Sequence, residues 1–106
     1  MNNNLQQEVE EMEKSPHVLA QERMDIANSY MEKGKRMAKI KKMKAEWWKL
    51  ARENFKSDAS ADRAWDLLPE GDEMETLRLE MKWMEMQMSA IKTLLQTLDM
   101  ESRNFY

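Results

Sequence analysis

Residues 74–98, with the sequence METLRLEMKWMEMQMSAIKTLLQTL, decide the fold of this chain. Apolar side chains recur there at alternating intervals of three and four residues over roughly four heptads. This spacing places them on one face of an α-helix and predicts a coiled-coil-like helix. The residues of this seam are Met74, Leu77, Met81, Met84, Met88, Ile91, Leu95 and Leu98.

The same helix has a second apolar stripe on the side opposite the seam. Its residues, which we call the outer face, are Leu79, Trp83, Met86, Ala90 and Met100. A helix that is apolar on two sides needs two partners, and the first is the other long helix of the chain. The second is either the short middle helix, in a three-helix core, or another copy of the chain. An oligomeric bundle is favoured, because a chain of 106 residues has little else to bury this face against.

The boundaries between helices are marked by the few residues that stop them. The chain has only two Gly and two Pro, and both residue types disfavour helix interiors. Ser15 is interpreted as an N-cap, with Pro16 at the first helical position. Pro69 and Gly71 mark the clearest break, and Asp72 is interpreted as the N-cap of the next helix, with Glu three positions later. The predicted helices are about 16–56, 59–68 and 72–103, the second capped by Ser57 or Asp58.

The first long helix is expected to run antiparallel to the second and to be the longer of the two. Lys33 and Lys44 interrupt its apolar face. Trp47 and Trp48 can both contact one wide interface, so we interpret them as core anchors against the 77–88 part of the partner helix. If exposed, the pair instead marks a binding hot spot. The predicted fold is all-α: a long antiparallel, coiled-coil-like helical hairpin with a short connecting helix, forming part of an oligomeric bundle.

Residues 15–106 are expected to form this single helical-hairpin domain, and residues 1–14 an acidic N-terminal arm. The arm contains Leu5, Val9 and Met12 at positions i, i+4 and i+7, together with four glutamates. It stops at the helix boundary before Pro16. We interpret it as a frayed helix or a docking arm.

A run of basic residues is the feature that most directly suggests function. Residues 33–44, KGKRMAKIKKMK, contain seven bases and no acid. With the predicted bounds, an antiparallel hairpin places this run opposite residues 86–100, where Asp99 is the only acid, so the charge is not neutralised within the chain. The run is then a surface for nucleic-acid phosphates or an acidic protein, or a solvated helix face. Its bases are Lys33, Lys35, Arg36, Lys39, Lys41, Lys42 and Lys44.

No pattern typical of catalysis or metal binding occurs in the chain. It has no Cys and a single histidine, His17, and two glycines cannot form a phosphate-cradling loop. Carboxylates on a charged helix are solvated unless a pocket shifts their pKa. We therefore predict no enzyme, no catalytic, cofactor-binding or metal-binding residues, no cofactor and no small-molecule substrate. No run of eighteen apolar residues occurs and the first residues do not match a signal peptide, so no membrane association is expected.

Residues 30–106 combine a charged helix that contains Glu46, Trp47 and Trp48, a loop, the heptad seam and an ending that contains Glu101, Arg103, Asn104 and Phe105. This arrangement resembles small helical proteins encoded by tailed phages and prophages. The resemblance implies a phage accessory protein of the kind found beside replication and recombination genes, whose biochemistry is mostly unassigned. It also implies a location in the cytoplasm of an infected or lysogenic bacterial host.

Three functions are compatible with these features. The first is a non-enzymatic phage-type interaction or modulator protein that binds protein through its helices, for example to inhibit a host or defence protein. The second is a nucleic-acid-binding accessory factor of a phage replication or recombination module that uses residues 33–44. The third is a structural coiled-coil component. The two-sided helix, the Met-rich surface and the charge blocks favour the first, with a homo-oligomer and a protein partner.

Overall fold

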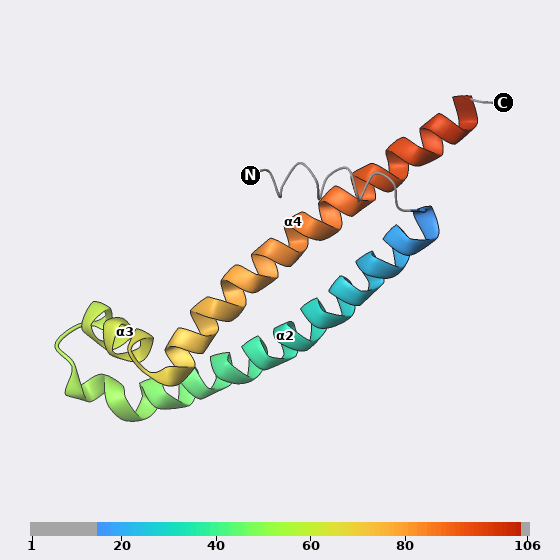
Figure 1. Cartoon of the computed structure of the whole chain (residues 1–106). Helices are drawn as coiled ribbons and strands as arrows, with labels where there is room; N and C mark the ends of the chain where they lie inside the picture. The colour runs from blue at the N-terminus through green and yellow to red at the C-terminus, as the bar shows by residue number, and fades with distance from the viewer. Residues whose placement is uncertain (1–14, 105–106) are drawn as a thin grey trace, which may run out of the picture. The chain divides into compact units, whose positions relative to one another are not determined.

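The computed structural model describes residues 15–104. These residues are helical almost throughout and include no strand, which confirms the all-α prediction. In chain order they form helix α2 (Pro16–Ala51), the short 3-10 helix η1 (Arg52–Asn54), helix α3 (Asp58–Asp66) and helix α4 (Pro69–Asn104) (Figure 1). The predicted arm, residues 1–14, and the predicted ending at Phe105 lie outside the described residues.

Two of the helices begin where the sequence predicts, and each start has a side-chain cap. At α2, the Ser15 hydroxyl oxygen accepts a hydrogen bond from the Val18 backbone N–H at 3.3 Å. At α3, the Ser57 hydroxyl oxygen accepts one from the Ser60 backbone N–H at 3.1 Å. Ser57 rather than Asp58 is therefore the cap. Both bonds satisfy donors that a helix start otherwise leaves without partners.

Helix α4 begins three residues earlier than predicted. The backbone N–H of Asp72 donates to the Leu68 carbonyl at 3.0 Å, so Asp72 already lies in the first turn and its prediction as the N-cap is wrong. Pro69 takes the first helical position, where its missing N–H costs nothing. Gly71 is likewise helical rather than part of a break. Because α2 also ends earlier, at Ala51, both long helices have 36 residues, and the predicted difference in their lengths is wrong.

The described residues fall into two compact units. Unit 1 combines residues 15–29 with 84–104, and unit 2 is Tyr30–Trp83. In unit 1, Leu19 and Ile91 are buried. The remaining seam residues of this unit are half-buried: Met84, Met88, Leu95 and Leu98.

The core of unit 2 brings together one residue from each of its three helices. Ile40 of α2, Trp65 of α3 and Leu77 of α4 are buried and form one hydrophobic cluster. Half-buried residues pack around this cluster: Met37, Trp47, Leu68 and Met74. Burying these apolar surfaces is the main stabilising contribution in unit 2.

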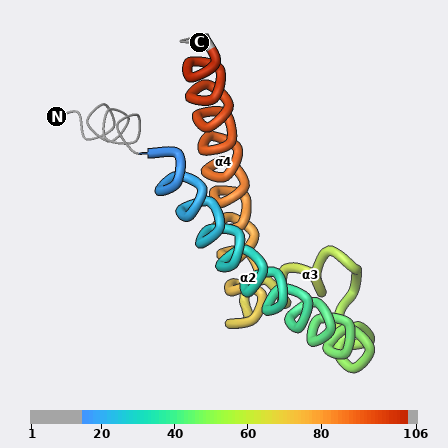
Figure 2. The backbone as a smooth tube through the Cα atoms, turned by 90° about the vertical axis from the view of Figure 1, so that its right-hand side faces the viewer, coloured from blue at the N-terminus to red at the C-terminus, as the bar shows by residue number. Residues whose placement is uncertain are grey.

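Trp47 makes its ring contacts with the connecting segment. Its ring centroid lies 5.6 Å from that of Trp65 and 5.9 Å from that of Phe55. Trp48, also half-buried, has the Arg52 guanidinium 6.0 Å from its ring centroid. Figure 2 shows α3 next to the C-terminal part of α2. Trp47 also packs against the cluster that contains Leu77, which lies in the 77–88 segment against which it was predicted to pack. The ring contacts of Trp47 with Phe55 and Trp65, and the contact of Trp48 with Arg52, add the connecting segment to this interface.

The two glycines give a matched test of this packing. A Cβ atom at Gly34 would lie 3.7 Å from the Met81 methyl carbon, an ordinary contact, whereas one at Gly71 would overlap the Trp65 carbonyl oxygen. We expect Gly34→Ala to stabilise the chain by about 0.4–1 kcal/mol. Gly71→Ala should destabilise it by about 1–3 kcal/mol, because backbone has to move. Thermal unfolding followed by circular dichroism measures both. Equal effects of the two substitutions would contradict the close approach of α3 to the start of α4.

Candidate interaction surfaces

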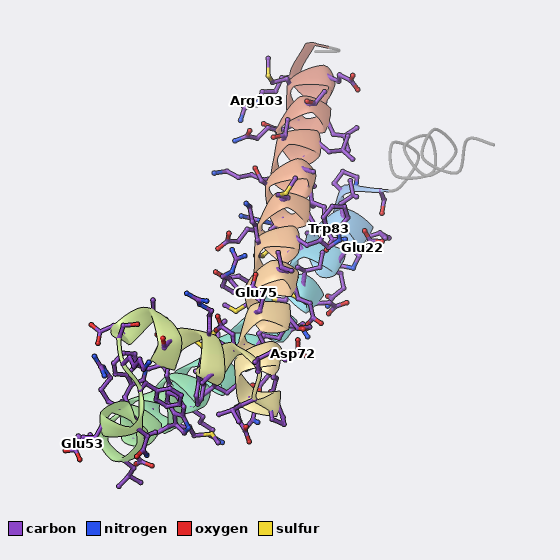
Figure 3. The ribbon with its side chains drawn as sticks, turned by 90° about the vertical axis from the view of Figure 1, so that its left-hand side faces the viewer. Glu22, Glu53, Asp72, Glu75, Trp83 and Arg103 are labelled. Carbon is purple, nitrogen blue, oxygen red and sulfur yellow. The ribbon has the colours of Figure 1, made fainter. Side chains whose placement is uncertain are left out.

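The outer face of α4 is exposed along its length. The exposed fractions are 54% for Leu79, 61% for Trp83, 58% for Met86 and 64% for Met100, and Ala90 is exposed as well. Figure 3 shows the labelled Trp83 on α4. The first two of these residues belong to unit 2 and the other three to unit 1. Since exposed apolar residues that share one helix face can mark binding sites, the outer-face residues of each unit are candidate interface residues.

Helix α3 does not cover the outer face. Its buried residues, Ala61 and Trp65, lie on the side that packs into the core with Ile40 and Leu77. Leu79 and Trp83, on the other side of α4, remain exposed in the same unit. The alternative in which the short middle helix covers the outer face is therefore wrong for unit 2, although α3 does contribute Trp65 to the core of that unit.

Much of the basic run is paired with acids within the chain. Lys33 binds Glu80, and Arg36 binds Glu73 through two hydrogen bonds of 2.6 and 2.8 Å. Lys44 lies 3.6 Å from Asp62 of α3, and Lys35 lies 3.2 Å from Glu32 one turn before it on α2. The prediction that the run faces residues 86–100 and stays unneutralised is wrong for these four bases.

The pairing follows from where α4 starts. The predicted bounds place the C-terminal end of α2 beside the start of α4, with α3 as a connection between them. Instead, α3 packs back through Trp65 against Ile40, about three turns before the end of α2. Helix α4 therefore begins beside that part of α2, and the antiparallel helices of unit 2 place Arg36 opposite Glu73 and Lys33 opposite Glu80.

Three bases of the run remain without an ion pair among residues 15–104. They are Lys39, Lys41 and Lys42, all exposed. Helical spacing puts Lys39 and Lys42 on the side of Lys35, whereas Lys41 points elsewhere. The seven bases thus do not form one unpaired basic stripe, which is the arrangement that binding along a phosphate backbone favours.

The Arg36–Glu73 pair perturbs the titration of both groups. Its hydrogen bonds, and then its charge attraction, lower the pKa of Glu73 below the usual glutamate range and raise that of Arg36. A lowered carboxyl pKa favours the folded state above the ordinary glutamate pKa. That contribution is lost as the pH falls through the lowered value. Both groups are well exposed to solvent, so the pair fixes register more than it adds stability.

A cavity of about 490 Å³ lies in unit 2 between α2, α3 and the start of α4. Trp65, Met37 and Met74 contribute apolar surface, and three bases and three acids also line it: Lys41, Lys44, Arg78, Asp66, Asp72 and Glu75. Arg78 donates two hydrogen bonds to Glu75 and lowers the pKa of that carboxyl. A carboxylate stabilised in its charged form is a weak general base, so this arrangement provides no evident acid–base chemistry.

Residues 15–104 contain neither a metal-binding cluster nor a helix suited to cross a membrane. Within this range, no three His, Cys, Asp or Glu side chains are grouped so that they could hold a metal ion. None of the helices in the same range has both the length and the apolar character required to cross a bilayer.

Comparison with known proteins gives no guide to the function. No match to this chain was found among protein-family models, curated proteins or solved structures.

Sequence reasoning missed two residues that shape the packing. Leu19 is fully buried, and its intervals of seven, four and seven residues to Ile26, Tyr30 and Met37 place it on their side of the helix, which could have revealed it. Gly71 is buried against Trp65, which no local sequence signal indicates.

A charge swap tests the observed register. Arg36→Glu places two acids together and should lower the melting temperature at neutral pH by a few degrees. The double variant Arg36→Glu, Glu73→Arg should recover most of that loss, because the ion pair is restored with its partners exchanged. Thermal unfolding monitored by circular dichroism provides the readout.

The matched control is Lys39→Glu alone and combined with Glu73→Arg. Lys39 makes no ion pair among the described residues, so this combination should show no recovery. Recovery equal to that of the Arg36 swap would mean that a general charge effect, rather than the specific pair, is responsible.

Proposed function

We propose that this chain is a non-enzymatic interaction protein that acts through helix-mediated protein binding, with the outer face of α4 as its binding surface. In this proposal, the two long helices close as one antiparallel hairpin, and the hairpin associates with a second copy of the chain. The observation that carries the proposal is the exposure of the outer face, including its Trp83. Tryptophan is among the residues most enriched at the energetic centres of protein interfaces.

The outer face carries no charge over more than four helical turns. Charged residues make up 35% of the chain, yet residues 83–98 contain only Glu85 and Lys92. Helical spacing puts both on the side of α4 away from Trp83. A solvated helix face normally carries charged residues, whereas the centre of an interface is depleted of them. This distribution supports an interface over a solvated face.

The side chains of the outer face complement one another when the helix is paired with its own antiparallel copy. With Ala90 at the two-fold axis, the large Trp83 lies opposite the small Thr97, and Met86 lies opposite Leu94. Trp83 thus meets a smaller side chain, Met86 meets one of similar size, and the small Ala90 occupies the point of closest approach. Such self-complementarity is what a two-fold interface between identical subunits requires.

The charges at the ends of the outer face agree with the same pairing. Lys82 and Glu101 are exposed and make no ion pair among residues 15–104. In the antiparallel pairing, Lys82 of one copy lies within about one helical turn of Glu101 of the other, and the symmetry repeats the contact. These pairs would set the direction of association more than its strength.

The other functions have less support. A nucleic-acid role would rest on Lys39, Lys41 and Lys42, since the other bases of the run already have acidic partners. A phage-type modulator role, in which the chain inhibits a host or defence protein, rests on the resemblance of residues 30–106.

Light scattering with size separation tests the proposal. The full chain should show a mass of twice 12.7 kDa at micromolar concentration. Trp83→Asp should weaken self-association by about 30-fold or more, because losing a hot-spot aromatic costs about 2 kcal/mol or more. Circular dichroism should show the same helix content in the variant, since Trp83 is already exposed.

Leu50→Asp is the control. Leu50 is 83% exposed and lies on α2, so this variant adds the same charge in place of an exposed apolar side chain away from the outer face. It should keep the mass of the unaltered chain. A mass of 12.7 kDa for the unaltered chain, or equal dissociation by both variants, would overturn the proposed pairing.

A further inference from the structure

Met86, in unit 1, lies where a single chemical change alters the outer face most. Its side chain is 58% exposed among the described residues. It is four residues from Ala90, the position that the proposed pairing puts at its two-fold axis, and so is Leu94 on the other side. In the pairing, Met86 of each copy packs against Leu94 of the other. A change at Met86 therefore enters the interface twice, close to its centre.

We propose that Met86 is a modification site, at which oxidation of the thioether to the sulfoxide by a peroxide prevents self-association. The proposal rests on the pairing of outer faces proposed above and adds a means of regulating it. Oxidation turns a flexible apolar side chain into a polar one, and it disrupts interfaces that depend on methionine.

The reaction requires only this side chain and the oxidant. The sulfur lone pair of Met86 attacks one oxygen of hydrogen peroxide, and the S–O bond forms as the O–O bond breaks. The other oxygen leaves as water with both hydrogens, so the sulfur loses two electrons and the peroxide gains them. Reductases reverse the change with two thiols, which become a disulfide while the oxygen leaves as water.

Oxidation and pairing exclude each other at this residue. Met86 is open to solvent in the free chain, whereas the pairing covers it with Leu94 of the second copy. Peroxide therefore reaches the sulfur in the free chain. The resulting sulfoxide oxygen is a hydrogen-bond acceptor, and the Leu94 side chain opposite it has no donor. Because burying a polar group without a partner is unfavourable, the oxidised chain stays unpaired.

The other methionines of α4 are less suited to this role. Met100 is exposed as well, but it lies ten residues from Ala90, at the rim of the proposed interface, where polar groups are common. The remaining ones are half-buried on the seam, where packing restricts access of an oxidant: Met74, Met81, Met84 and Met88.

Peroxide treatment of the full chain, with Met24 as the matched control, tests the proposal. Met24 is 59% exposed and belongs to the same unit, but it lies on α2 and not on the outer face. Mass spectrometry of peptides measures oxidation at both residues. Oxidation of Met86 should slow as the protein concentration rises, because only the free chain reacts, whereas that of Met24 should not change. Light scattering should show the oxidised chain at 12.7 kDa, with its helix content retained.

Two pairs of variants assign the effect to one sulfur. Met86→Leu keeps an apolar side chain that peroxide does not oxidise, so it should keep the paired mass after treatment, whereas Met24→Leu should dissociate like the unaltered chain. Met86→Gln introduces a polar group without any oxidant and should weaken self-association about tenfold or more. Met24→Gln should not weaken it.

The outcomes separate this proposal from the pairing on which it rests. A mass of 12.7 kDa for the unoxidised chain would overturn both. A pair that persists when Met86 is fully oxidised would overturn the modification site alone, as would dissociation of Met86→Leu by peroxide, since another methionine would then be responsible. Dissociation accompanied by loss of helix content would also overturn it, because oxidation of the seam would then be the cause.

Discussion

Trp65 connects all three helices of unit 2, and the arrangement of that unit depends on where this side chain lies. It is buried between Ile40 of α2 and Leu77 of α4, and Trp47 packs on its ring. Its carbonyl oxygen approaches Gly71 so closely that no Cβ atom fits there. The first turn of α4 is therefore held beside the middle of α2 rather than beside its end. Truncating an aromatic residue at such a position typically costs about 3–5 kcal/mol.

The position of Trp65 explains how charge is distributed in unit 2. Starting α4 beside the middle of α2 brings Glu73 and Glu80 opposite Arg36 and Lys33. The basic run, residues 33–44, has no obvious acidic partners in the sequence, but four of its seven bases form ion pairs within the chain. In contrast, the apolar outer face of α4 stays exposed among residues 15–104.

Those parts of the structure that depend on local spacing could be predicted from the sequence. The three-and-four spacing correctly indicated a helix, and all its seam residues from Met74 to Leu98 are buried or half-buried. The caps at Ser15 and Ser57 followed from local hydrogen-bond chemistry. The sequence left two alternatives for the outer face: the short helix covers it, or it stays exposed for another copy of the chain. It could not decide between them, because it does not show where the short helix packs.

The register between helices could not be predicted, because it depends on a contact between distant residues. In the sequence, Pro69 and Gly71 predict an interruption between two helices, since glycine and proline usually interrupt helices. In the structure, Pro69 starts α4 and Gly71 makes room for the carbonyl of Trp65. An error of three residues in the start of α4, together with the placement of α3, was enough to assign the basic run to the wrong partner.

In our proposal, α4 packs through its seam and binds through its outer face. Methyl NMR of the methionines tests both faces in one experiment, since Met74 and Met81 lie on the seam and Met86 and Met100 on the outer face. Spectra recorded over a range of protein concentrations should show shifts for the methyl groups of Met86 and Met100, and none for those of Met74 and Met81. Outer-face signals that do not change with concentration, or seam signals that change equally, would contradict the claim.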